Sequence, residues 1–294
     1  MLGAIIGDIA GSRFELNNYR KKDFELFHRD SFYTDDSVMT IAVCDALLRS
    51  APDFASKKLA ENAVRSMREI GRAYPDCGYG AGFSRWLFSK GPKPYGSYGN
   101  GAAMRVSGCA YAAGALEEAL RLSDAVTCVT HDHPEGIKGA RATAAAIYLA
   151  RTGAEKKQII GHIRENYYGY DFTGAFTIES VRPAYGFGEA CQNTVPQALE
   201  AFFESGNFED AIRTAVSLGG DSDTLAAITG SIAEAYYGVP ADMRERALGY
   251  FDRDRDRNLL DVLRAFEERY PPRITPECGN SEGERSAGDG DKEG

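Results

Sequence analysis

Helical periodicity extends along most of this chain of 294 residues and constrains its fold more than any other feature. In the segment DTLAAITGSIAEAYYG, the spacing of Leu225, Ile228, Ile232 and Tyr236 places them on one face of an α-helix. Asp221 and Asp223 lie at the start of this segment and Gly238 at its end, and helix ends favour both residue types. Convincing alternation of period two, as in strands, is hard to find. The sequence therefore predicts an all-α fold.

The same periodicity predicts further helices along the chain. They cover Ser37–Arg49, Phe54–Ile70, Ala102–Ala113, Leu116–Thr127, Glu135–Ala150, Glu155–Asn166, Val195–Glu204, Phe208–Ser217, Ala241–Tyr250 and Asp256–Glu268. We expect residues 1–274 to form one domain, a compact multi-helix orthogonal bundle with a central cleft. Residues 275–294 contain no Ile, Leu, Val or aromatic residue, so we predict a disordered acidic tail there.

Charge and composition exclude several classes of protein. The net charge is −9, of which the tail contributes −4 and the rest −5, so we expect no binding of free nucleic acid. No apolar run reaches the roughly 18 residues that a transmembrane helix needs, and the N-terminal segment does not resemble a signal peptide. The six cysteines show no CxxC spacing. We expect a monomeric, cytoplasmic protein.

The loops between the predicted helices are short, polar and rich in Gly, Asp, Asn and Tyr. They read GDIAGSRFE, YTDDS, CGYGAG, PYGSYGNGAAMR, THDHP and GGDSDT. Loops carry functional sites more often than cores do. This pattern indicates one polar cleft that is built from many helix ends.

Two carboxylate clusters stand before predicted helices. They are Thr34-Asp35-Asp36 and Asp221-Ser222-Asp223-Thr224. Helix capping is one interpretation of each cluster, but capping does not require adjacent, mutually repelling carboxylates. The other interpretation is an all-oxygen site for two divalent cations, Mg²⁺ first and Mn²⁺ as an alternative, with the threonines as neutral ligands. Zinc is disfavoured, because the four histidines form no HxxxH pair.

Two further features are weaker signals when taken alone. Glycines in the loop Gly96–Gly101 would let the backbone approach a ligand, and amides at a helix start bind anions. The loop is neither a Walker A nor a GxGxxG motif, and a structural turn is the alternative. His131, in THDHP, either lines the cleft or is a surface or capping residue.

Taken together and in this order, these loops resemble those of the ADP-ribosylglycohydrolase family from Gly3 to about Pro240. YTDDS, GSYGNGAAMR, TH and GGDSDTLAAITGSIAEAYYG carry the resemblance. It implies that a binuclear Mg²⁺ site is formed by Thr34, Asp35, Asp36, Asp221, Asp223 and Thr224. It also implies contacts to ADP-ribose from Gly78, Gly80, Gly96, Ser97, Tyr98, Gly99, Asn100 and His131. Glu15 matches the glutamate that closes over the site in several members.

The resemblance implies a Mg²⁺-dependent hydrolase that cleaves the C1″ glycosidic bond between ADP-ribose and an acceptor. Glu15, Asp36 and Asp223 are then the expected catalytic residues. The alternatives are an ADP-ribose reader without turnover and a metal-dependent phosphohydrolase of nucleotide diphosphates. Either Tyr95 or Tyr98 could stack on adenine. The segment Tyr167–Glu189 is either a packed connection or a loop on the acceptor side, and the acceptor itself stays open.

Overall fold

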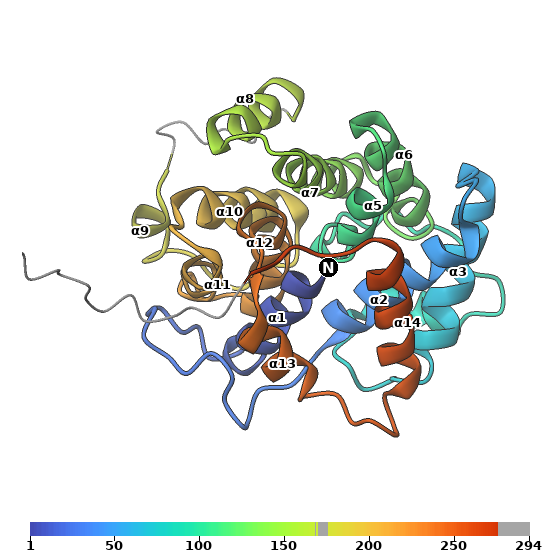
Figure 1. The fold of residues 1–294 in the computed structure, drawn as a ribbon, viewed down its shortest axis with the longest axis horizontal. Helices are drawn as coiled ribbons and strands as arrows, with labels where there is room; N and C mark the ends of the chain where they lie inside the picture. Colours follow the sequence, from blue (N-terminus) through green and yellow to red (C-terminus); the bar gives the residue numbers. More distant parts are fainter. Residues whose placement is uncertain (168, 170–175, 276–294) are drawn as a thin grey trace, which may run out of the picture.

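A pair of packed helices, α1 (Leu2–Gly11) and α12 (Ser222–Tyr237), lies at the centre of the computed structural model (Figure 1). The structure describes residues 1–167, 169 and 176–275. Every residue of α1 is buried, and so are most residues of α12. A helix that is apolar on all sides belongs in the interior of a larger assembly of helices. Two helices that are more than 200 residues apart in the chain therefore build the middle of the fold.

Glycines allow this central pair to pack with direct backbone contact. A Cβ added to Gly3 would lie 2.1 Å from the carbonyl oxygen of Gly230, and one added to Gly7 would lie 2.0 Å from that of Ala226. One added to Gly11 would lie 2.5 Å from the Cα of Asp223. These glycines recur every four residues and so form a stripe on one face of α1. The stripe sets the distance between the two helices.

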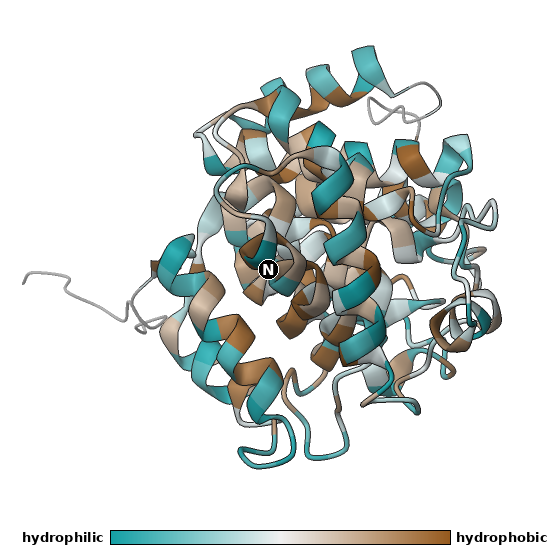
Figure 2. Cartoon of the chain, turned by 90° about the vertical axis from the view of Figure 1, so that its right-hand side faces the viewer, coloured by the Kyte–Doolittle hydropathy of each residue, from teal (hydrophilic) through white to brown (hydrophobic). Residues whose placement is uncertain are grey.

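The remaining helices surround this pair. They are α2 (Asp35–Ser50), α3 (Ser56–Gly71), α4 (Ala81–Phe88), α5 (Ser107–Ala112), α6 (Leu116–Thr127), α7 (Pro134–Arg151), α8 (Lys156–Asn166), α9 (Ile178–Val181), α10 (Cys191–Glu204), α11 (Phe208–Val216), α13 (Ala241–Leu248) and α14 (Arg257–Arg269). Two 3₁₀ helices, η1 (Ser12–Phe14) and η2 (Asn100–Ala102), lie between them. Figure 2 shows hydrophobic residues gathered toward the middle and hydrophilic residues on the outer helix faces.

A single strand pair occurs in the described part of the chain. β1 (Val239–Pro240) pairs in parallel with β2 (Ile274–Thr275), Val239 opposite Ile274. Thr275, the first residue of the predicted tail, therefore belongs to this pair, while residues 276–294 lie outside the described residues. Within the described part, no helix combines the length and hydrophobicity that crossing a bilayer requires. The all-α prediction is confirmed.

Two predicted segments need correction. GDIAGSRFE is not a loop, because α1 continues through Gly11 and η1 follows it directly. Its glycines serve helix contact and not a turn. The helix predicted over Ala102–Ala113 begins only at Ser107, after η2 and a short turn. Helices α4 and α9 were not predicted, since each is too short to show clear periodicity.

Candidate active site

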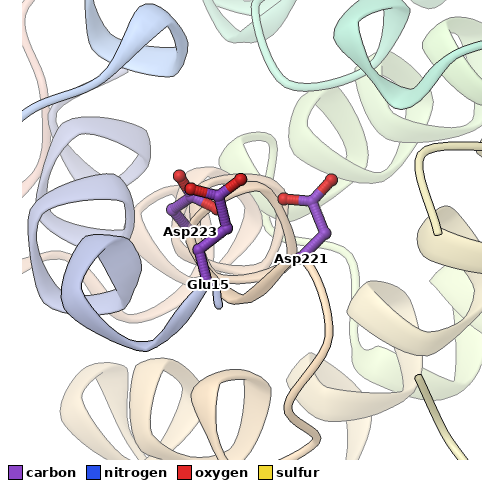
Figure 3. A group of neighbouring side chains, drawn as sticks. All are labelled: Glu15, Asp221 and Asp223. Carbon is purple, nitrogen blue, oxygen red and sulfur yellow. The ribbon is translucent and has the colours of Figure 1, made fainter. Parts of the chain in front are cut away.

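Three acidic side chains that are far apart in the sequence converge beside the central helix pair. Carboxylate oxygens of Glu15, Asp221 and Asp223 all lie within 4.8 Å of one another (Figure 3). Glu15 directly follows η1, Asp221 is the residue before α12, and Asp223 lies in the first turn of α12. The glycine stripe holds these backbones together. Like charges at this separation repel, so the cluster needs bound protons or a cation.

The first turn of α2 brings a second acidic group to the same place. Thr224 Oγ1 donates a hydrogen bond of 3.1 Å to Asp36 Oδ2. Asp36 Oδ1 is buried and has no hydrogen-bond partner in the described part of the chain. Asp35 also lies in this turn, and its backbone N–H donates to the Cys77 carbonyl at 2.7 Å. The two clusters predicted from the sequence thus form one site.

Capping explains only part of these clusters. The Thr34 hydroxyl accepts a hydrogen bond of 3.3 Å from Asp36 N, as a capping residue does. Asp221 occupies the capping position of α12, yet its side chain makes no capping hydrogen bond. Its Oδ2 instead accepts a hydrogen bond of 2.7 Å from Asn100 Nδ2. The Asp221 carboxylate therefore faces the shared site, whereas Asp223 Oδ1 also accepts a hydrogen bond of 3.0 Å from Thr224 N in its own helix.

Asp8, on α1, was not predicted and holds the start of α2 in place. Its buried carboxylate accepts hydrogen bonds from Thr34 N at 2.9 Å and from Thr34 Oγ1 at 2.8 Å. It also accepts one from Ser37 N at 3.0 Å and one from the Ser37 hydroxyl. Burial raises the pKa of Asp8 to about 6, although these four hydrogen bonds oppose the shift. The only feature of the sequence that could have indicated this role is that Asp8 is a single carboxylate inside an apolar N-terminal segment.

The electrostatics of the cluster suit a cation. Burial raises the pKa of Asp35, Asp36 and Asp223 well above the usual aspartate range, and neighbouring carboxylates raise it further. Burial, followed by the charges of Asp221 and Glu189, also raises the pKa of Glu15. Hard divalent cations bind carboxylate and hydroxyl oxygens, and Asp36 Oδ1 is a buried oxygen with no partner among the described residues. The residues present therefore fit such a cation.

A cavity of about 330 Å³ opens above these acids. It is lined by predicted residues Glu15, Thr34, Asp35, Asp36, Gly78, Gly80, Ser97, Gly99, Asn100, His131, Asp221, Asp223 and Thr224. Two predicted ligand-binding residues are not among the described residues that line it. Gly96 N donates to Asp132 Oδ1 at 2.7 Å, and the half-exposed Tyr98 ring lies against His133 with 5.2 Å between centroids. Of the two tyrosines considered for adenine, only Tyr95 lines this cavity.

The glycine-rich loop is held in place by the segment that precedes α10. Asn100 N donates to the Glu189 carbonyl at 2.6 Å, and Cys191 N donates to the Tyr98 carbonyl at 2.9 Å. Phe187 and Glu189 themselves line the cavity. This end of the Tyr167–Glu189 segment therefore belongs to the cleft and is not merely a packed connection. Residues 168 and 170–175 lie outside the described residues.

Other lining residues were not predicted. They include Phe32, Tyr33, Asp76, Phe83, Met104 and Arg105. Phe32 and Phe187 are each 53% exposed, so they form an apolar rim at the cavity. Apolar and charged residues next to a motif are common in any sequence. Tyr33, Met104 and Arg105 do lie in loops that the sequence assigns to a cleft, but no local pattern shows which residues of those loops line it.

Comparison with known proteins agrees with this geometry. The family model described as ADP-ribosylglycohydrolase matches residues 1–273. The chain is 28% identical to the ADP-ribosylhydrolase ARH3 of Homo sapiens, with 86% of this chain and 89% of that protein covered. It is also 28% identical to the ADP-ribosylarginine hydrolase Tri1 of Pseudomonas putida (strain GB-1), with 81% and 70% covered. A solved structure described as an ADP-ribosylglycohydrolase-related protein complex shares the fold, with a TM-score of 0.60, 22% identity and coverage of 90% of this chain and 96% of that one.

Proposed function

The chain belongs to the ADP-ribosylglycohydrolase family, and we propose that it hydrolyses the C1″ bond between ADP-ribose and an acceptor in a Mg²⁺-dependent reaction. One observation carries this proposal. Acidic residues that are far apart in the sequence meet at a cavity that a glycine-rich loop also lines. The acids suit a developing positive charge at the anomeric carbon, and the loop suits a phosphorylated ligand.

The proposed metal ligands are the six residues at the starts of α2 and α12. They are Thr34, Asp35, Asp36, Asp221, Asp223 and Thr224. The number of carboxylates supports two ions, and Mn²⁺ could replace Mg²⁺ because both prefer oxygen ligands. When bound, such ions supply Lewis-acid chemistry that polarises substrate oxygens. The buried, unpaired Asp36 Oδ1 is the observation that most supports this assignment.

Glu15 is the proposed residue that positions and deprotonates the attacking water. Its side chain is only partly buried, lines the cavity and lies at the edge of the acidic cluster. Its raised pKa makes it a stronger base than an exposed glutamate. Asp36 and Asp223 contribute negative charge that stabilises an oxocarbenium-like transition state at C1″.

The other wall of the cavity is the proposed binding region for ADP-ribose. The backbone of Gly99–Gly101 can approach the diphosphate, because no side chain of these glycines intervenes. Asn100, His131 and Ser97 offer polar groups on the same side. Tyr95, which is 39% exposed and lines the cavity, is the proposed stacking partner of adenine.

The deciding experiment is product analysis with two substrates, an arginine-ADP-ribosylated and a serine-ADP-ribosylated peptide, each incubated with Mg²⁺ or with EDTA. The proposal expects intact ADP-ribose from at least one peptide, with Mg²⁺ only. Preference for one peptide identifies an N-linked or an O-linked acceptor. AMP and ribose phosphate as products would instead identify a phosphohydrolase. Binding of ADP-ribose without release from either peptide would identify a reader.

Asp223→Asn is the diagnostic variant for this experiment, and Asp124→Asn is its matched control. Asp124 pairs with Arg141 on the outer surface, where N and O atoms are 2.6 Å apart. Both substitutions remove one negative charge and keep the side-chain shape. Loss of release in Asp223→Asn but not in Asp124→Asn supports the proposed site. Equal activity in both variants would reject it.

A further inference from the structure

Arg105 has the largest of the fully buried side chains among the described residues, and it lies in the wall of the cavity. It is 1% exposed, and no carboxylate of the described residues forms an ion pair with it. Burial lowers the pKa of its guanidinium to about 10, so the group is still charged at neutral pH. Burying a charge without an acidic partner is costly. Such a residue calls for an explanation in terms of what it contacts.

The guanidinium contacts two consecutive residues of the THDHP loop. Arg105 Nη2 lies 2.7 Å from Thr130 Oγ1 and 3.2 Å from His131 Nδ1. Thr130 Oγ1 lies 2.7 Å from the same Nδ1. A guanidinium can only donate hydrogen bonds. Nδ1 must therefore accept from the guanidinium. The Thr130 hydroxyl, which accepts from Arg105, has one hydrogen and two acceptors within reach, Nδ1 at 2.7 Å and the Thr127 carbonyl at 3.4 Å, and the shorter contact assigns it to Nδ1.

This arrangement fixes where the proton of His131 resides. A neutral imidazole whose Nδ1 accepts carries its hydrogen on Nε2. A second proton, on Nδ1, would point at the positive guanidinium. In agreement with this geometry, burial and the charge of Arg105 lower the pKa of His131 well below its usual value. The ring is thus held neutral with a defined donor.

The donor faces the loop that lines the cavity. A Cβ added to Gly101 would lie 3.4 Å from His131 Nε2, and one added to Gly99 would lie 3.6 Å from it. Within the part of the chain that the structure describes, Nε2 makes no hydrogen bond of its own. An uncharged donor that is oriented before binding loses little entropy when it meets an acceptor oxygen.

We propose that Arg105, together with Thr130, is a positioning residue that locks His131 in its Nε2–H tautomer, so that His131 presents one fixed donor to an oxygen of the ligand. The ligand part of this inference rests on the proposed function, which supplies ADP-ribose with its diphosphate and hydroxyl oxygens. The lock itself is a property of the protein without ligand. The two parts can therefore be tested separately.

The lock is tested by ¹⁵N NMR of the imidazole rings in ligand-free, histidine-labelled protein. The chain has four histidines, and loss of one ring's signals in His131→Gln assigns His131. The proposal expects a single neutral form at pH 7, with Nδ1 as the unprotonated and Nε2 as the protonated nitrogen. An Nδ1–H tautomer, a mixture, or a charged ring in the unsubstituted protein would overturn it. The tautomer itself is read in the unsubstituted protein, and only the assignment of the ring uses a variant.

Two pairs of variants then test the cause. Arg105→Met removes the donors and Thr130→Val removes the hydroxyl, while Arg105→Lys and Thr130→Ser retain them. We expect mixed tautomers and an approximately tenfold weaker affinity for ADP-ribose in the first pair, and partial or full rescue in the second. A pure Nε2–H tautomer with unchanged affinity in both Arg105→Met and Thr130→Val would overturn the assignment. A locked tautomer in a protein that binds no ADP-ribose would leave the lock intact and count against the proposed function alone.

Discussion

Thr224, in the first turn of α12, donates a hydrogen bond of 3.1 Å to the Asp36 carboxylate in the first turn of α2. This contact joins two helix starts that are 188 residues apart in the chain. Only one Asp36 oxygen is satisfied by it, and the other is buried without a hydrogen-bond partner in the part of the chain that the structure describes. The pair therefore marks the point where the two acidic segments become one site.

Asp36→Asn should abolish activity without unfolding the protein. Replacing a proposed metal ligand removes charge stabilisation, so we expect hydrolysis to fall at least about 100-fold. The asparagine keeps the shape and relieves repulsion among buried carboxylates, so the melting temperature in EDTA should not fall.

Mg²⁺ at about 100 times its dissociation constant should stabilise the unsubstituted protein by about 2.7 kcal/mol. It should stabilise the variant much less. Thermal melts with and without Mg²⁺ check this, and equal Mg²⁺ stabilisation of both proteins would contradict it.

Gly7→Ala should destabilise the fold although alanine is the better helix former. The added methyl group would lie 2.0 Å from the Ala226 carbonyl oxygen, so α1 and α12 would have to separate. We expect a loss of about 2 kcal/mol or more in the free energy of unfolding, together with weaker activity. Gly161→Ala on α8 is the control, because no described residue outside α8 has an atom within 4 Å of its added Cβ. The free energy of unfolding of Gly161→Ala should rise by about 0.5–1 kcal/mol. Urea denaturation measures both, and a stable Gly7→Ala variant would refute the close contact.

Tyr95 and Tyr98 should differ in their effect on substrate affinity. Tyr95 lines the cavity, whereas Tyr98 lies against His133. Because stacking on a base contributes about 1–3 kcal/mol, we expect Tyr95→Ala to raise the dissociation constant of ADP-ribose about tenfold. Tyr98→Ala should leave it within about threefold. Calorimetric titration with ADP-ribose distinguishes the two. The reverse order of effects would assign adenine to Tyr98.

Glu200→Gln should stabilise the protein at alkaline pH and not at acidic pH. Burial and the neighbouring Glu204 raise the pKa of Glu200 from 4.5 to about 7. Below about pH 4.5 the folded and unfolded states are both protonated at this residue. As the pH rises toward 7, the unfolded chain loses the proton first, so stability is lost across this interval. The glutamine cannot ionise and avoids this loss, so we expect it to gain about 1–2 kcal/mol at pH 8. Denaturation at pH 4 and pH 8 tests it, with Glu268→Gln on the exposed face of α14 as control.

Strongly periodic segments could be predicted from the sequence. Leu116–Thr127 was predicted with the observed bounds, and α2, α7 and α8 with shifts of one or two residues. Helix α1 was not predicted, because glycine is normally a sign of turns. Its role here depends on a partner helix more than 200 residues away, which no local pattern reveals.

The acidic cluster could be predicted because, like helical periodicity, its pattern is local in the sequence. Adjacent carboxylates before two helices are unusual enough to be recognised locally, and the structure brings both clusters to one cavity. Asp8 and Arg105 were missed because each is a single charged residue in an apolar stretch. What distinguishes them is the set of buried partners that they hold, Thr34 with Ser37 and Thr130 with His131. Those partners become known only when the loops are assembled.

Because of the glycine stripe on α1, substitutions can change the distance between α1 and α12, and with it the distance between the acidic segments, in one direction only. Helix pairs usually move closer or farther apart as larger and smaller side chains replace one another between them. At Gly3, Gly7 and Gly11 no smaller residue exists, so the two backbones already stand at their lower limit of separation. Every substitution there can only widen the gap between the segments that carry Glu15 and Asp223. A narrower or reshaped acidic site must therefore arise by changing the length of the acidic side chains themselves.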